Sequence, residues 1–94
     1  MELGGKPYTD KILSENRVIR TFNETVSQEE CEWHRDREDR VIRVLEGKGW
    51  KLQKDNELPF TLGSSSVITI KKEQYHRLIT GDTPLVVEIT KHFK

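Results

Sequence analysis

Apolar residues recur at short intervals along the chain, and β-branched residues gather in brief runs separated by Gly, Asn, Asp, Ser or Pro. This pattern is typical of short β-strands, and no segment shows a comparable helical periodicity. Turn-forming residues at 55–56, 63–66 and 81–84 mark breaks between the runs. Strands are therefore predicted at residues 17–22, 40–46, 49–54, 58–62, 67–71, 75–80 and 85–90.

The spacing of these strands, about 8–12 residues, is typical of a β-sandwich or a small barrel. A chain of 94 residues is expected to form one domain, 1–94, because chains usually divide only above roughly 200 residues. Residues 1–11 contain two glycines and a proline before Tyr8, and we interpret them as an arm or an edge strand. The pattern thus predicts a single all-β domain.

The amino-acid composition argues for some classes of binding partner and against others. Hydrophobic residues make up 33% of the chain and charged residues 34%, so the core must be thin, and a homodimer is expected because it would bury more surface. The 16 basic and 16 acidic side chains cancel, which argues against nucleic-acid and membrane-surface binding. The sequence contains neither a signal-peptide pattern nor an apolar run of about 20 residues, so a cytoplasmic protein is expected.

The single cysteine, Cys31, has no second cysteine in the chain with which to form a disulfide. A reactive thiol needs a nearby activating base or cation, whereas its neighbours are Glu30 and Glu32. We therefore interpret Cys31 as a small strand side chain.

The candidate chemistry lies in a charged stretch that begins at His34. On an extended strand His34 and Asp36 point to the same face, and His76 precedes a later apolar run. Brought together, the three would form the two-histidine, one-carboxylate face that suits non-haem Fe(II). The alternative is a solvated surface, since seven of the eight residues from 34 to 41 are ionisable, with His76 as a hydrogen-bonded structural histidine.

Other histidines and aromatic residues are given structural interpretations. His92, near the C-terminus, is expected to be exposed. Trp33 and Trp50 are interpreted as core residues, although either could line a pocket.

The order of these features resembles a known family. His34-x-Asp36-x-x-x-Arg40, followed by residues 44–47 (Val-Leu-Glu-Gly), is similar to the first cupin motif, where His-x-His is followed by Glu and then by Gly. Residues 65–76 have the length of the second cupin motif and keep its histidine as His76, with Lys71 and Glu73 in the places of its proline and second glycine. The resemblance spans roughly 17–90. It implies a small double-stranded β-helix, the cupin-type jelly-roll barrel of the RmlC-like superfamily.

The resemblance also implies a degenerate metal site. His34, Asp36 and His76 stand at positions of metal ligands, and Arg40 stands where the motif has glutamate. Aspartate retains ligand capacity, whereas arginine is a fixed cation that repels a divalent metal. Two arrangements remain open. The triad holds Fe, Ni, Mn or Zn while Arg40 clamps a ligand carboxylate, or Arg40 pairs with Asp36 or Glu38 and no metal binds.

Three functions are compatible with the sequence. The first is a metal-dependent enzyme, such as an oxygenase, isomerase or lyase, acting on a small anionic molecule held by Arg40 or Arg77. The second is a metal-free module that binds a sugar or carboxylate through Arg40, Trp50, Tyr75 and His76. The third is a structural or dimeric interaction domain. The sequence assigns no catalytic residue, substrate or reaction among them.

Overall fold

The described part of the chain folds mainly into β-strands. A computed structural model describes residues 8–23 and 32–92, and within these ranges the chain forms strands and no helix. It therefore offers, in the part described, no helix that could cross a membrane. The strands are β1 (Tyr8–Ile12), β2 (Arg17–Phe22), β3 (Asp39–Glu46), β4 (Lys51–Lys54), β5 (Phe60–Thr61), β6 (Val67–Ile70), β7 (His76–Ile79) and β8 (Leu85–His92).

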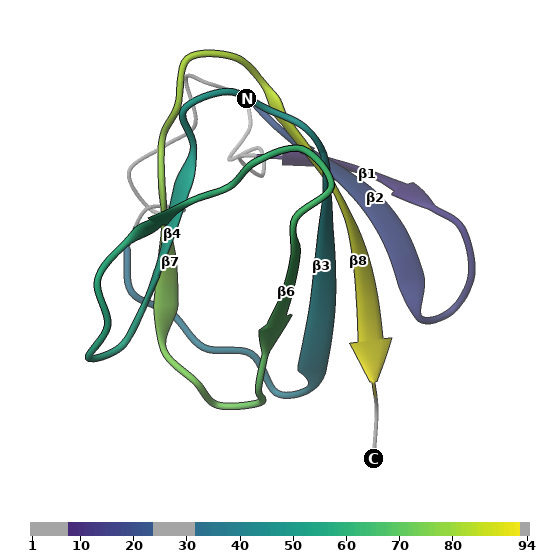
Figure 1. Cartoon of the computed structure of the whole chain (residues 1–94). Coiled ribbons are helices and arrows are strands. Elements are labelled where there is room, and N and C mark those ends of the chain that lie inside the picture. The colour runs from purple at the N-terminus through teal and green to yellow at the C-terminus, as the bar shows by residue number, and fades with distance from the viewer. Residues whose placement is uncertain (1–7, 24–31, 93–94) are drawn as a thin grey trace, which may run out of the picture.

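The strands form two antiparallel sheets. One has five strands in the order β1-β2-β8-β3-β6, and the other has three in the order β5-β4-β7. The two sheets face each other in a jelly-roll arrangement, with β1 and β2 extending to one side (Figure 1). Among the described residues the sheets do not join into one continuous closed barrel, because hydrogen bonding ends at β1 and β6 in one sheet and at β5 in the other.

Alternation of buried and exposed residues fixes the inner face of each strand. In β2, and in β8 as far as Ile89, every second residue is buried, as a pleated strand with one face on a core requires. Between the sheets lies one apolar core, which consists of Val18, Phe22, Val44, Trp50, Leu52, Leu62, Ile68, Ile70, Leu78, Leu85, Val87 and Ile89.

Trp50 is the largest residue in this core and is fully buried. Its indole Nε1 donates a hydrogen bond to the carbonyl of Thr83 in the β7–β8 turn. Gly81, in the same turn, lies so close that an added Cβ would stand 2.4 Å from the Lys48 carbonyl oxygen and 2.5 Å from the Trp50 backbone nitrogen. The close approach of these two turns therefore requires glycine at position 81.

The predicted all-β class is confirmed, and each predicted strand has an observed counterpart, with shifted ends in every case except 17–22. The largest shift is at 58–62, where only Phe60–Thr61 pairs; Leu58 is 87% exposed, and Pro59 has no N–H to donate. Residues 8–11 of the predicted arm or edge strand belong to β1, an edge strand paired with β2. Residues 1–7 and Cys31 lie outside the described residues.

The interpretation of Trp33 as a core residue was wrong. Its side chain is 43% exposed, and the guanidinium of Arg77 lies 5.0 Å from its ring centroid. Trp33 directly precedes His34, whose neighbour across the bridge is His76. Because adjacent residues of an extended chain point to opposite faces, turning His34 inward places Trp33 outside.

Candidate metal centre

An isolated antiparallel bridge brings the two distant histidines together. His34 N–H donates to the His76 carbonyl at 3.0 Å, and His76 N–H donates to the His34 carbonyl at 2.9 Å. Their rings lie edge to face, with centroids 4.4 Å apart. The segment around His34 thus lies beside β7, and the two imidazoles are direct cross-strand neighbours.

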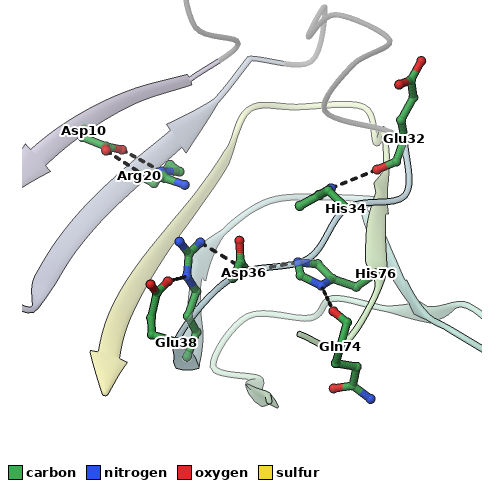
Figure 2. Close-up of polar contacts among 9 residues, drawn as sticks. Asp10, Arg20, Glu32, His34, Asp36, Glu38, Gln74 and His76 are labelled. Atoms are coloured by element: carbon green, nitrogen blue, oxygen red, sulfur yellow. Dashed lines mark hydrogen bonds and ion pairs between the residues drawn. The ribbon is translucent and has the colours of Figure 1, made fainter. Parts of the chain in front are cut away.

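Asp36 completes the cluster from the segment that leads into β3. Its backbone carbonyl accepts a 2.7 Å hydrogen bond from Glu73 N–H. One ligand atom from each of His34, Asp36 and His76 lies within 4.8 Å of the others. Figure 2 shows the Asp36 carboxylate directed toward the ring of His76. The predicted convergence of the three side chains is therefore present in the structure.

The β6–β7 loop that carries this hydrogen bond has a strained backbone at Glu73. Its φ of 64° is a left-handed conformation that favours glycine. Glu73 stands where the resemblance to the second cupin motif places glycine, the residue that adopts this conformation without strain.

Hydrogen bonds determine which nitrogen each histidine presents. His34 Nδ1 lies 2.9 Å from the Glu32 carbonyl, and His76 Nδ1 lies 2.8 Å from the Gln74 carbonyl (Figure 2). A carbonyl only accepts, so both Nδ1 atoms carry the proton and donate. In the neutral rings Nε2 then carries the lone pair, which is the arrangement that orients metal-ligating histidines.

Asp36 Oδ2 faces one of these lone pairs. It lies 3.4 Å from His76 Nε2, is buried, and accepts no hydrogen bond from any described residue. A buried acceptor without a donor is costly, and here two acceptors meet. A cation between them would satisfy both atoms.

Burial also favours the neutral form of His76. Its side chain is buried, and this desolvation lowers the pKa of the imidazole below its ordinary value of 6.5. The hydrogen bond to Gln74 and the charge of Asp36 act in the opposite direction, while His34 and Arg40 lower the pKa further. His76 is therefore neutral and able to act as a ligand at neutral pH.

Arg40, on β3, lies beside the cluster and is paired with two carboxylates. Its Nε donates to Glu38 Oε2 at 2.6 Å, and its terminal nitrogen Nη1 lies 3.5 Å from Asp36 Oδ2. All three side chains are largely buried. This pairing is the second of the two arrangements left open by the sequence, and it also offsets the positive charge that Arg40 would direct at a metal.

A cavity of about 50 Å³ adjoins the cluster. A water molecule needs at least about 10–15 Å³ by the same measure, so the space admits only a few atoms beyond a metal ion. Its polar wall consists of Arg20, His34, Asp36, Arg40 and His76, and core residues such as Phe22, Ile42 and Leu78 form the rest.

The remaining candidate residues lie elsewhere. Trp50 and Tyr75 are not among the residues that line this cavity: Trp50 is buried in the core, and Tyr75 is 41% exposed beneath the guanidinium of Arg35. Arg77 turns outward, where it contacts Trp33 and donates to Gln53. His92 is exposed, as expected.

Sequence reasoning missed Arg20. It is a buried cation on the inner face of β2 and lines the cavity. The sequence does indicate this position, because Arg20 lies in the alternating run Val18-x-Arg20-x-Phe22. A period of two predicts that all three side chains share the core face of the strand.

No protein-family model and no curated protein matches the sequence. Solved structures do match. A cupin domain from Bordetella pertussis has a TM-score of 0.62 at 21% identity, with 99% of each chain covered. A cupin-2 domain containing protein from Shewanella frigidimarina has a TM-score of 0.64 at 15% identity, covering 94% of this chain and 84% of that one.

A third similar structure contains a metal. It is Fe(II) HppE in complex with its substrate, with a TM-score of 0.66 at 11% identity, covering 90% of this chain and 52% of HppE. At these identities the likeness is one of fold. The chain adopts the cupin fold, and it carries a candidate His-Asp-His metal site inside that fold.

Proposed function

We propose that this protein is a divalent-metal-binding cupin that acts on or senses a small molecule. His34 Nε2, His76 Nε2 and Asp36 Oδ2 are the proposed ligands. The observation that carries the proposal is the buried Asp36 Oδ2, which accepts no hydrogen bond from any described residue and faces both the Nε2 lone pair of His76 and, at 3.5 Å, a terminal nitrogen of Arg40.

The ligand set fits a first-row transition metal. Imidazole nitrogens and a carboxylate oxygen suit Fe, Ni, Mn or Zn, and three protein ligands leave positions open. When bound, such an ion would polarise an oxygen atom of a small molecule as a Lewis acid. The iron in HppE supports this class of ligand for the fold.

The protein's own residues prepare the site. The carbonyls of Glu32 and Gln74 hold the imidazoles with Nε2 free to bind. Arg40, which is itself held by Glu38, lies 3.5 Å from Asp36 Oδ2, the same oxygen that faces His76 Nε2. The apolar cavity wall limits the entry of water, which strengthens charge interactions inside.

Elemental analysis of protein purified without an affinity tag or chelator tests the proposal. About one metal ion per chain is expected for the wild type, and His34→Ala, His76→Ala or Asp36→Asn should each lower the content severalfold by removing a ligand. His92→Ala is the matched control, because His92 is exposed at the far end of β8 and should leave the content unchanged. A metal content that is the same in the wild type and in all three ligand variants would refute the proposal.

A metal-free ligand-binding module is the second candidate. The pairing of Arg40 with Asp36 and Glu38 favours it, since this pairing already neutralises one carboxylate of the cluster. Its signature is a sugar or carboxylate that raises the melting temperature of metal-stripped protein, an effect that Arg40→Ala abolishes. If a screen of sugars and carboxylates finds no such compound, this candidate function is excluded.

A further inference from the structure

The charged side chains beside the proposed metal ligands come from one short stretch of chain. Residues 33, 35 and 37 are exposed, whereas the side chains of Asp36, Glu38 and Arg40 are only 12%, 14% and 17% exposed. Two largely buried carboxylates thus lie close to one guanidinium. A buried charge needs a partner, so the choice of Arg40 between the two carboxylates affects the ligand Asp36.

Arg40 is hydrogen-bonded to Glu38 and only close to Asp36. Its Nε donates to Glu38 Oε2 at 2.6 Å, which is a short, charge-assisted hydrogen bond (Figure 2). Its Nη1 lies 3.5 Å from Asp36 Oδ2, farther than the about 2.7–3.2 Å of an N–H···O hydrogen bond, and this oxygen accepts none from any described residue. Glu38 therefore holds the guanidinium just outside hydrogen-bond distance of the proposed ligand atom.

Asp36 Oδ2 is a possible partner for two cations. It lies 3.4 Å from His76 Nε2 and is one of the three atoms proposed to bind the metal. A guanidinium N–H that donates to this oxygen would weaken it as a metal ligand, because the donor withdraws charge from it and the guanidinium repels the ion. The apparent metal affinity should therefore fall with the fraction of molecules in which Arg40 is bonded to Asp36.

We infer that Arg40 competes with the metal for Asp36 Oδ2, and that Glu38 is a positioning residue that favours metal binding by holding the guanidinium. This inference rests on the proposed function, because one of the two competitors is the metal ion. Glu38 does not belong to the His-Asp-His cluster, so it acts through Arg40. Among the described residues Arg40 forms ion pairs only with Asp36 and Glu38, so without Glu38 it would turn to Asp36.

Zinc affinities in a double-mutant cycle test this inference. Zn²⁺ alone is the probe, and its dissociation constant is measured by competition with a chromophoric chelator for the wild type, Glu38→Gln, Arg40→Gln and the double variant. Glutamine at position 40 removes the charge and keeps an amide N–H, so the Glu38 carboxylate retains a possible donor. Arg43→Gln is the matched control, because Arg43 lies on the same strand and is exposed.

The effect of Glu38 should depend on Arg40. Glu38→Gln should weaken zinc binding about tenfold, since the released guanidinium bonds to Asp36, whereas Arg40→Gln should tighten it severalfold. In the Arg40→Gln background the substitution of Glu38 should have a much smaller effect, and Arg43→Gln should leave the affinity unchanged. An ion pair that only stabilises the fold would not tighten zinc binding when it is broken. Equal losses from Glu38→Gln in both backgrounds, or weaker binding by Arg40→Gln than by the wild type, would overturn the inference.

A crystal structure of metal-free Glu38→Gln is a second test, which needs no substitution of Arg40. A guanidinium nitrogen of Arg40 should lie about 2.7–2.9 Å from Asp36 Oδ2, as in a charge-assisted hydrogen bond. A guanidinium that stays at its wild-type distance from this oxygen contradicts the inference.

The same zinc measurements separate this inference from the proposed function. Zinc binding by the wild type without coupling between positions 38 and 40 contradicts the competition and leaves the proposed function standing. Zinc binding by Arg40→Gln but not by the wild type contradicts the proposed function and supports the competition. Zinc binding by none of the four forms contradicts both.

Discussion

His76 is the most buried of the three proposed ligands, with 5% of its surface exposed. Desolvation by burial lowers its pKa below 6.5 in the folded protein, whereas in the unfolded chain the imidazole titrates near that value. As pH falls below about 6.5, the unfolded chain takes up this proton before the folded protein does. Acid should therefore destabilise the metal-free protein through this residue.

The free energy of unfolding of chelator-treated protein tests this effect. It should fall as pH is lowered from 7.5 through the folded pKa of His76, and the fall should be shallower in His76→Gln, where no imidazole titrates. Both proteins are unfolded with urea at each pH under identical conditions. Identical slopes for the two proteins would contradict the assignment of His76 as a buried neutral imidazole.

At the residue scale, spacing and the resemblance to the cupin motifs together predicted which side chains meet. His34 and Asp36 share a face because they are two positions apart, and the resemblance to the cupin motifs placed His76 beside them. The partner of Arg40 could not be predicted, because Asp36 and Glu38 are both within its reach. Arg20 was missed since its partners, Asp10 and Tyr8, lie on a strand interpreted only as an arm or edge.

The β7–β8 turn packs closely against the β3–β4 turn, and this contact positions Trp50. In Gly81→Ala the new methyl group would press on the Lys48 carbonyl and the Trp50 backbone, which cannot rotate away as a side chain could. The expected cost is about 1–3 kcal/mol of unfolding free energy, as is typical of overpacking.

Gly63→Ala is the matched control for this substitution. A Cβ at position 63 meets only the Ser66 hydroxyl oxygen, at 3.6 Å, so its effect should be much smaller. Urea denaturation of both variants gives the comparison. Equal stability of Gly81→Ala and Gly63→Ala would show that the two turns are not packed as the structure has them.

At the scale of elements, alternation predicted strands well where one face is buried. β2 matches its predicted bounds, and β8 extends the prediction by two residues. Prediction was poorer where pairing is short. Around His34 only one bridge forms, because the charged residues that follow have no apolar face to bury, and near Pro59 the missing N–H shortens β5.

At the scale of the whole molecule, length and strand spacing indicated a β-sandwich or a small barrel, and the resemblance to the cupin motifs implied the jelly roll. The three solved structures described above share that fold at 21% identity or less, so packing pattern rather than particular residues defines it. The homodimer inferred from the thin core stays a prediction, which the mass in solution tests against the 11.0 kDa of one chain.

In the proposed site, one metal ion bonds to His34 Nε2, His76 Nε2 and Asp36 Oδ2. Anomalous X-ray scattering from crystals grown with Fe, Ni, Mn or Zn, measured at that metal's absorption edge, locates the ion. One peak is expected at about 2.0–2.2 Å from these three atoms. Crystals whose only anomalous peaks lie away from these atoms, with Asp36 still paired to Arg40, would contradict it.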